Sequence, residues 1–306
     1  MMQLSIPLCD IADATDSKSD ADFFATNGYL VLKSAFSEDL INDTAEWTQK
    51  RFWSDSGEQL LFPRLQDEWK DCELVKRIAT NETILQKLQE LYGRLPIPFQ
   101  TLSFPVGTQQ RTHSDTIHFH CFPQRFMCGV WVALEDVHEG NGPLHYYPGS
   151  HRLPVLQCPD VGIDRSSVPG GPANPPENQK YRFYEDAIQE LIGIAGLSKS
   201  VTELSKGDAL IWAANLLHGG EPIKEPGATR FSQVTHYYFE GCRFYTPLLS
   251  DFPGKYIHTR VNITDIRTGS VVAQSGVVEP SIEVAEDGLF ARAGRRVDRI
   301  IRRIRN

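Results

Sequence analysis

Three side chains in this sequence could hold one metal ion together. His113 and Asp115 stand two residues apart, and His218 lies far downstream in the segment Leu217-His218-Gly219-Gly220. Two imidazoles and one carboxylate cover one face of an octahedral Fe(II) ion and leave about three of its six positions open. We therefore take His113, Asp115 and His218 as candidate ligands of a non-haem iron site that binds a cosubstrate and O2 together.

A second pair of histidines offers a competing metal site. His118 and His120 also stand two residues apart, so both imidazoles could share one face of a strand, as in cupins. Such a site needs an acidic ligand a few residues further on, and the next acid after His120 is Glu135. We rank this alternative, a metal-dependent cupin isomerase or dioxygenase, lower and expect His118 and His120 to line or shield the pocket.

Arg230 and Ser232 could bind a carboxylate. They alternate on the segment 230–236, whose composition is typical of a strand, so both side chains would lie on one face. A guanidinium binds a carboxylate through two parallel hydrogen bonds, and a hydroxyl adds another. A buried arginine without an anion would be costly. The alternative is that Arg230 pairs with an aspartate or glutamate of the chain itself.

The elements that would position these residues change in character along the chain. The N-terminal part predicts a short helix and an Asn27-Gly28 turn before a strand at 29–32. A second helix is predicted to begin at Ser37 and to run to about Phe52. A third is predicted to begin at Asn81 and to end at Gly93. We therefore predict that residues 1–100 form a mainly helical region that packs on the core.

The following part of the sequence has the texture of a β protein. Short apolar runs rich in aromatic and β-branched residues occur at 126–134, 209–212 and 230–239, with Gly, Pro and Asn between them. This pattern predicts a mainly β fold of the sandwich or barrel type with flanking helices. In a strand, residues two apart point the same way, so the first two ligand candidates would face inward and a neighbouring strand would bring the third opposite them.

The order and spacing of these pieces resemble one known family, the phytanoyl-CoA dioxygenase-like Fe(II)/2-oxoglutarate oxygenases. The resemblance covers roughly residues 22–240. One departure is Gly140, which follows Glu139 where the family commonly has an acid, and it falls in a loop away from the ligands. The segments that carry the resemblance are Asn27-Gly28-Tyr29-Leu30-Val31-Leu32, His113-Ser114-Asp115, Trp131-Val132-Ala133-Leu134-Glu135-Asp136, Asn141-Gly142-Pro143-Leu144, Pro148-Gly149-Ser150-His151, Gly207-Asp208 and Arg230-x-Ser232.

The resemblance implies a double-stranded β-helix core, a jelly-roll of the cupin type, over residues 101–288. It implies Fe(II) held by the two histidines and the aspartate, 2-oxoglutarate held through its distal carboxylate, and O2 as the second cosubstrate. In the family, the histidine of the Pro-Gly-Ser-His turn lies close to the active site, so His151 is a further candidate for cofactor binding. Its alternative role is that of a turn histidine that only packs. The residues implied for the iron are His113, Asp115 and His218, and those for 2-oxoglutarate are Arg230 and Ser232.

The activity that the resemblance implies is hydroxylation of an unactivated C–H bond of a small molecule, with 2-oxoglutarate converted to succinate and CO2. Halogenating relatives lack the ligand carboxylate and leave its place to halide, so Asp115 favours hydroxylation. The alternative from another class is a cupin-like protein, non-catalytic or with a different activity, that binds a sugar, a lipid or a partner chain.

Gln109, Arg111 and Trp131 are candidates for the substrate wall, because they bracket the metal pair in the sequence. Trp131 could equally belong to the core. Arg111 has the same strand parity as His113 and Asp115. If Arg111 faces inward, it indicates an anionic substrate.

Two further segments carry predictions. The segment 159–181 is rich in Pro and Gly, and a loop of this length inside a domain predicts a substrate-covering lid, or else an ordered surface insertion. The segment 289–306 combines arginines with an apolar stripe at helical spacing. It predicts a basic amphipathic helix that contacts an anionic membrane surface or mediates self-association, unless it packs on its own domain.

Composition narrows the class of protein. With 306 residues, of which 41% are hydrophobic, the chain can bury a sizeable core as a single domain, and its net charge of -8 argues against nucleic acid as a partner. Six cysteines without CxxC spacing indicate reduced thiols. No apolar stretch approaches the roughly 18 residues of a membrane span. We expect a cytoplasmic protein that acts on a small molecule.

Overall fold

Antiparallel β-sheets form the framework of this protein, in the unit that spans Met1–Ala273. The computed structural model describes residues 19–54, 62–156, 160, 177–250 and 256–274. The predicted basic helix at 289–306 and most of the predicted lid at 159–181 lie outside the described residues. Residues 177–181 of that predicted loop are helical, because they begin a helix that continues to Ile194.

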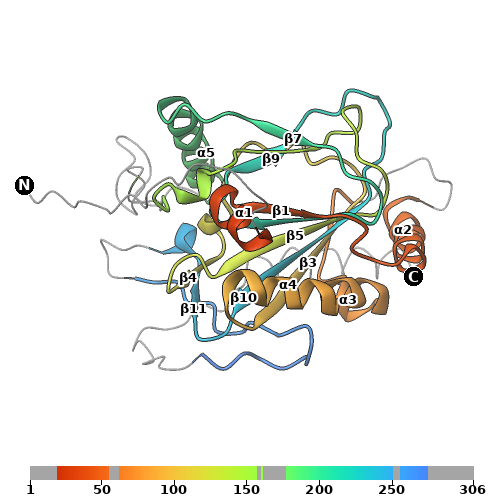
Figure 1. The fold of residues 1–306 in the computed structure, drawn as a ribbon, viewed down its shortest axis with the longest axis horizontal. Helices are drawn as coiled ribbons and strands as arrows, with labels where there is room; N and C mark the ends of the chain where they lie inside the picture. Colours follow the sequence, from red (N-terminus) through yellow and green to blue (C-terminus); the bar gives the residue numbers. More distant parts are fainter. Residues whose placement is uncertain (1–18, 55–61, 157–159, 161–176, 251–255, 275–306) are drawn as a thin grey trace, which may run out of the picture. The chain divides into compact units, whose positions relative to one another are not determined.

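The largest sheet has six strands, and each is antiparallel to its neighbours (Figure 1). The three apolar runs predicted as strands are confirmed as its central members, which agrees with their β-branched and aromatic content. In spatial order the strands are β1 (Tyr29–Leu32), β8 (Ala209–Ala213), β5 (Met127–Ala133), β10 (Ser232–Phe239), β3 (Pro96–Phe104) and β2 (Leu65–Gln66).

Two smaller sheets complete the described β-structure. One has the order β7 (Ser200–Thr202), β6 (Leu144–Tyr146), β9 (His218–Gly220), and the other pairs β11 (Arg243–Tyr245) with β4 (His120–Phe122). The candidate ligand His218 thus begins a strand of the three-stranded sheet, as expected for a residue on a neighbouring strand.

Helices flank these sheets. The N-terminal ones follow the predicted signals: the Asn81 side chain accepts a hydrogen bond from the Ile84 amide at 3.2 Å, and Gly93 ends the helix in the left-handed conformation. No helix of the described residues is long and apolar enough to cross a membrane. The helices are α1 (Asp20–Asn27), α2 (Glu38–Phe52), α3 (Glu73–Ala79), α4 (Glu82–Tyr92) and α5 (Glu177–Ile194), with 3-10 turns at Glu68–Lys70, Asp115–Ile117, Ser150–Arg152 and Pro247–Leu249.

Strand β3 runs across residue 100, where the helical region was expected to end. Pro96 and Pro98 lie inside this strand instead of closing the preceding section. They are tolerated because β2 pairs only with Ser103 and Leu102, so no strand of the sheet lies outside the first half of β3. The N-terminal region therefore contributes helices and, to the six-stranded sheet, the strands β1, β2 and most of β3.

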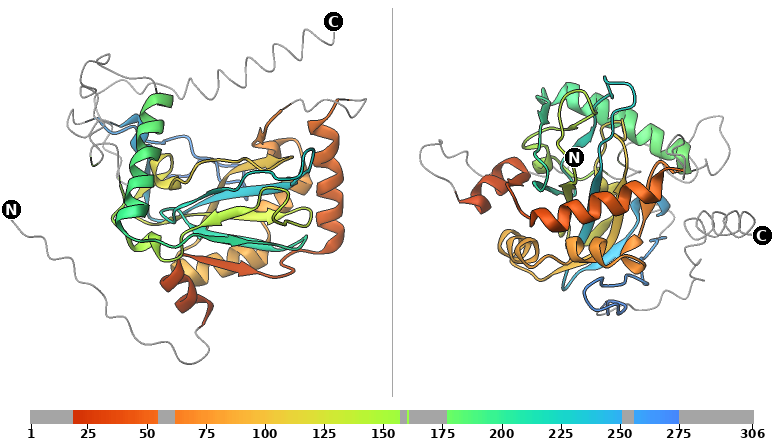
Figure 2. Two further views of the ribbon diagram at one scale, coloured as in Figure 1. Left: turned by 90° about the horizontal axis from the view of Figure 1, so that it is seen from above. Right: turned by 90° about the vertical axis from the view of Figure 1, so that its right-hand side faces the viewer.

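The two faces of the six-stranded sheet carry different parts of the core. On β8, Ala209, Ile211 and Ala213 pack with apolar side chains of the N-terminal helices, whereas Leu210 and Trp212 face the opposite way. We call the face that includes Leu210 and Trp212 the inner face. Helix α5 lies on the other side of the sheets from α3 and α4 (Figures 1 and 2).

Gly28, which follows α1, allows the ring of His151 to pack closely against the backbone. Its φ is +79°, and a Cβ atom there would lie 2.4 Å from Nδ1 of His151. We expect Gly28→Ala to lower the free energy of unfolding by about 2–4 kcal/mol, because left-handed strain of about 1–2 kcal/mol is joined by the displacement of a packed ring. Urea denaturation followed by circular dichroism measures the change.

Gly93→Ala is the matched control. Gly93 also follows a helix and has a φ of +65°, but no atom lies within 4 Å of its added Cβ. Only the backbone strain of about 1–2 kcal/mol is expected there. Equal losses for the two variants would show that the contact with His151 carries no energy.

Candidate metal centre

His113, Asp115 and His218 come together in the folded chain. Each offers one ligand atom, these atoms lie within 4.8 Å of one another, and all three residues are buried. The Nε2 atoms of His113 and His218 lie 3.6 Å and 3.7 Å from Oδ1 of Asp115. Two imidazole nitrogens and one carboxylate oxygen at these separations suit a divalent transition metal ion bound on one face.

Backbone pairing brings the two histidines together. The amide of His113 donates to the carbonyl of His218 at 2.9 Å, and the amide of His218 donates to the carbonyl of His113 at 3.0 Å. This isolated bridge lies at the start of β9. The two imidazole rings are consequently held 4.6 Å apart, measured between centroids.

The segment from His113 to Asp115 is not the regular strand that the sequence predicts. Asp115 begins the 3-10 turn Asp115–Ile117, because the Ser114 side chain accepts from the Thr116 amide and caps that turn. Ser114 itself is extended, with φ -122° and ψ 137°. The alternation expected of a strand therefore holds over these three residues, and both ligand candidates point to the same side.

Hydrogen bonds to the backbone orient both imidazoles. Nδ1 of His113 lies 2.9 Å from the carbonyl oxygen of Arg111, and Nδ1 of His218 lies 2.9 Å from that of Leu216. A carbonyl only accepts, so each Nδ1 carries the proton and each Nε2 keeps its lone pair. Both Nε2 atoms are thus ready to bind a metal.

The protonation states of the cluster agree with this role. Burial alone would raise the pKa of Asp115, but the neighbouring imidazoles of His218, His113 and His236 lower it far below its ordinary value. Burial lowers the pKa of His218 to about 4. For His113 the burial effect is outweighed by Asp115, which raises the pKa. At neutral pH the cluster therefore contains an ionised carboxylate and at least one neutral imidazole.

Arg230 and Ser232 lie on the inner face of the large sheet, beside Trp131. Arg230 is 1% exposed, and its Nη1 donates to the carbonyl of Gly142 at 2.6 Å. Within the described part of the chain, Nε of Arg230, Oγ of Ser232 and Nε1 of Trp131 have no hydrogen-bond partner. The guanidinium carbon of Arg230 lies 5.4 Å from the centroid of the Trp131 ring.

This group of donors has the character of an anion site. Among the residues described, no carboxylate lies within 4.0 Å of the Arg230 guanidinium. Burial lowers the pKa of Arg230 to about 10, against the opposing charge of Glu135, so the guanidinium is still a cation at neutral pH. A buried cation with unused hydrogen-bond donors on either side fits a carboxylate group of a bound molecule.

His151 and Gln109 lie elsewhere. Nε2 of His151 contacts the carbonyl of Ala25 at 3.0 Å, and its ring packs over Gly28. These contacts are those of a turn histidine that packs, which is the alternative role given for His151 above. Gln109 is exposed, and its side chain accepts from the Ile223 amide at 3.2 Å, so its contact is with a loop.

Arg111 does not face inward. Its guanidinium pairs with Asp186 at 2.7 Å and with Glu185 at 3.5 Å, both on α5. Residue 111 lies in irregular backbone, and the two carboxylates of α5 attract its side chain. The condition under which Arg111 would indicate an anionic substrate is therefore not met.

His118 and His120 belong to no metal-binding group of the described residues. The ring of His120 stacks on Tyr245, with centroids 4.8 Å apart. The ring of His118 lies 4.8 Å from that of Tyr181 on α5, and burial lowers its pKa to about 4, so it is neutral at pH 7. His118 thus flanks the cluster, as expected for a residue that lines the pocket.

Other side chains also lie beside the cluster. The Gln110 amide nitrogen lies 3.4 Å from Nε2 of His113 and donates to the Tyr181 hydroxyl at 3.2 Å. Nε1 of Trp212 donates to Oδ2 of Asp115 at 2.7 Å, and Nε2 of His236 lies 3.8 Å from the same oxygen. Alternation along each strand indicates the face on which Trp212 and His236 lie. It does not indicate that both contact Asp115.

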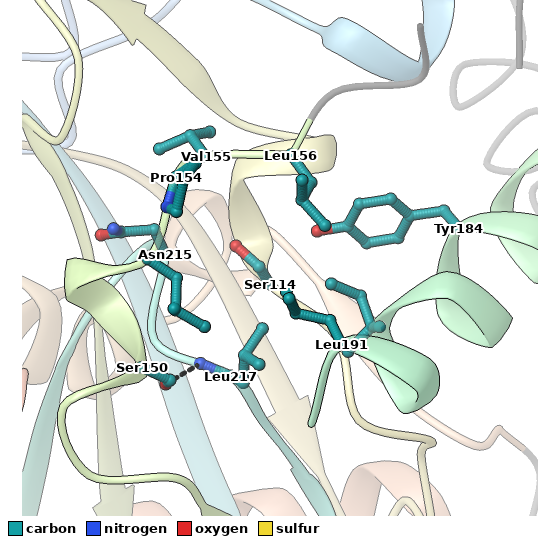
Figure 3. A pocket seen from close by; sticks show the side chains of 11 residues that line it. Ser114, Ser150, Pro154, Val155, Leu156, Tyr184, Leu191, Asn215 and Leu217 are labelled. Atoms are coloured by element: carbon teal, nitrogen blue, oxygen red, sulfur yellow. Dashed lines mark hydrogen bonds between the residues drawn. The ribbon is translucent and has the colours of Figure 1, made fainter. Parts of the chain in front are cut away.

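Figure 3 shows a small, largely apolar cavity next to the ligand segments. Ser114 and Leu217, which each adjoin a ligand candidate, line it together with Tyr184 and Leu191 of α5. Because Ser114 points away from the side that holds His113 and Asp115, this cavity lies behind the metal cluster. None of the three ligand candidates lines it.

A family comparison covers most of the structure just described. The model of the family described as "Phytanoyl-CoA dioxygenase (PhyH)" matches residues 24–231. The chain is 28% identical over 153 residues to 2-aminoethylphosphonate dioxygenase of uncultured bacterium HF130_AEPn_1, covering 44% of this chain and 58% of that protein. It is 26% identical over 159 residues to ectoine dioxygenase of Halomonas elongata, covering 49% and 45%. The matches span about half the length of these curated relatives.

Solved structures share the fold over a larger part of the chain. The epimerase SnoN, solved with Fe3+, alpha ketoglutarate and nogalamycin RO, matches with a TM-score of 0.58 and 18% identity, over 84% of this chain and 95% of that one. EctD from S. alaskensis with bound Fe matches with a TM-score of 0.57 and 19% identity, over 78% and 82%. At these identities the likeness concerns the fold.

The two ion pairs of Arg111 predict a local effect on α5. We expect Arg111→Ala to accelerate amide hydrogen exchange in residues 179–190, while the global free energy of unfolding falls by less than about 1 kcal/mol, because the pair is partly exposed. Exchange measured by mass spectrometry reports both quantities. Arg182→Ala is the control, since Arg182 is an exposed arginine on the same helix. Equal exchange in the two variants would contradict a role of Arg111 in holding α5.

Proposed function

Because the chain belongs to the phytanoyl-CoA dioxygenase family, we propose that it is an Fe(II)/2-oxoglutarate-dependent oxygenase with a jelly-roll core. One observation carries the proposal. A two-histidine, one-carboxylate cluster and a buried arginine with unused hydrogen-bond donors occur in the same described unit. An iron site alone fits many proteins, and a buried anion site alone fits many more, but this activity needs both.

The proposed iron ligands are Nε2 of His113, Nε2 of His218 and Oδ1 of Asp115. When bound, Fe(II) activates O2 and couples the decarboxylation of 2-oxoglutarate to succinate and CO2 with the oxidation of a C–H bond. The protein contributes pre-set imidazole tautomers and an ionised carboxylate, so little reorganisation is needed when the metal binds.

The proposed site for the distal carboxylate of 2-oxoglutarate consists of Arg230, Ser232 and Trp131. Nε of Arg230, Oγ of Ser232 and Nε1 of Trp131 are three buried donors that have no hydrogen-bond partner among the described residues. In this proposal Trp131 serves the cosubstrate and not the substrate, in contrast to the expectation from its sequence position. The bound carboxylate would neutralise the buried Arg230 guanidinium, which has no carboxylate within 4.0 Å among the described residues.

The proposed substrate is a small molecule that binds on the side where His118 and Tyr181 flank the cluster. His118 is neutral at pH 7, and its ring and that of Phe119 have centroids 6.1 Å apart, so this side offers aromatic surface and an uncharged imidazole. We propose hydroxylation as the outcome, because Asp115 keeps the place that a halide would need. The similar structures include an epimerase and a carbocyclase, so the product has to be identified directly.

The first test uses the purified protein without oxygen. With Fe(II) and 2-oxoglutarate we expect a weak visible metal-to-ligand charge-transfer band, and in air we expect succinate. His113→Ala or His218→Ala should abolish both, since each removes one of three ligand atoms. His258→Ala is the control, because this histidine lies outside the metal-binding group. A wild-type protein with neither band nor succinate would favour the alternative of a cupin-like binding protein.

The second test concerns the anion site. We expect Arg230→Met to raise by about 100-fold the 2-oxoglutarate concentration at which the charge-transfer band reaches half of its maximal intensity. The reason is that the buried distal carboxylate would lose its cationic partner. Ser232→Ala should raise it by about 5-fold, as for one hydrogen bond. The affinity for Fe(II) alone should stay the same in both. Arg243→Met, a change at an exposed arginine, serves as the control. Unchanged 2-oxoglutarate affinity in Arg230→Met would refute the assignment.

A further inference from the structure

The two oxygens of the Asp115 carboxylate have different surroundings. Oδ1 lies between the Nε2 atoms of His113 and His218, at 3.6 Å and 3.7 Å. Oδ2 accepts a hydrogen bond from Nε1 of Trp212 at 2.7 Å, with Nε2 of His236 at 3.8 Å. One oxygen therefore faces the ligand atoms, and the other is held by the protein.

Trp212 is the one hydrogen-bond donor to Oδ2 in the described part of the chain. Nδ1 of His236 lies 2.9 Å from Oε1 of Gln100, an acceptor, so the proton of the imidazole is on Nδ1 and a lone pair faces Asp115. At 3.8 Å His236 also lies beyond hydrogen-bond length. An indole nitrogen donates and never accepts, which fixes the direction of its bond to the carboxylate.

A glycine makes room for this indole. Gly129 on β5 is the register partner of Trp212 on β8, and a Cβ atom at residue 129 would lie 2.3 Å from the Trp212 ring. The ring therefore lies over the backbone of the neighbouring strand, where any side chain would displace it. The Trp212 ring also lies next to the ring of His218, and the centroids of these two rings are 4.9 Å apart. Trp212 is thus packed between a strand and a ligand, 4% exposed.

We propose that Trp212 is a positioning residue that holds Oδ2 of Asp115, so that the aspartate offers a metal only Oδ1, and that Gly129 is the residue that permits this arrangement. The inference rests on the proposed function. A carboxylate that bound through both oxygens would occupy two positions of the metal and leave about two of six open instead of three. A 2-oxo acid that chelates through two oxygens needs two positions, and O2 needs another. The Trp212 hydrogen bond thereby keeps the third position available.

The test uses Co(II) alone as the probe, so that no catalysis is required. We expect Trp212→Phe to weaken Co(II) binding by about 10-fold or more, the usual effect of removing a hydrogen bond to a ligand. Its visible absorption should also change in energy and intensity, because a freed carboxylate alters the coordination. Gly129→Ala should change both in the same direction by displacing the ring. Trp47→Phe on α2, where the Arg51 guanidinium carbon lies 5.7 Å from the centroid of the indole ring, is the matched control and should leave both unchanged.

Each outcome decides the proposal. Wild-type Co(II) affinity and spectrum in Trp212→Phe would overturn it. A Trp212→Phe protein that fails to fold, as judged by circular dichroism, would also count against it, because it would show that the indole acts through packing.

The outcomes also separate this inference from the proposed function. A wild-type protein that binds Co(II) but gives no charge-transfer band with Fe(II) and 2-oxoglutarate would remove the proposed function. The difference in Co(II) binding between wild type and Trp212→Phe would remain measurable in that case. A normal band in Trp212→Phe, with unchanged Co(II) binding, would remove the inference and leave the function.

Discussion

The backbone bridge between His113 and His218 is the interaction on which the site depends. Two hydrogen bonds of 2.9 Å and 3.0 Å join segments that are far apart in the sequence, and they place the backbones that carry the two imidazoles side by side. Because the bridge lies at the start of β9, the three-stranded sheet fixes one ligand segment and the Ser114-capped turn fixes the other. A shift of one residue in this pairing would turn both rings away from each other.

Around this bridge the protein orients each ligand through a different partner. Backbone carbonyls set the two imidazoles, and an indole on the inner face of the large sheet sets the carboxylate. Helix α5 adds Tyr181 beside His118 and is itself fastened by Arg111. The site thus combines residues from the six-stranded sheet, the three-stranded sheet and a helix, although the candidate ligand atoms come from two short segments.

The sequence predicted the central strands, and the pairs of polar residues that share one face, because both follow from short-range periodicity. Alternation placed His113 with Asp115, and Arg230 with Ser232, and β-branched runs marked β5, β8 and β10. Periodicity contains no signal for the contacts of Arg111 and His151, because their partners Asp186 and Ala25 are distant in the chain. The contacts of Trp212 required the register between β5 and β8, which no pattern within a single strand contains.

The prolines of β3 have a consequence for the behaviour of the protein at high concentration. Pro96 and Pro98 have no amide proton, and they occupy the half of β3 that β2 does not cover. The carbonyl of Pro98 already accepts from the Ile266 amide at 2.9 Å. At these two residues the edge of the large sheet has no amide that could donate a hydrogen bond to an incoming strand. A strand of another molecule therefore cannot form a regular series of backbone hydrogen bonds there. The same residues that begin the strand thus oppose edge-to-edge aggregation.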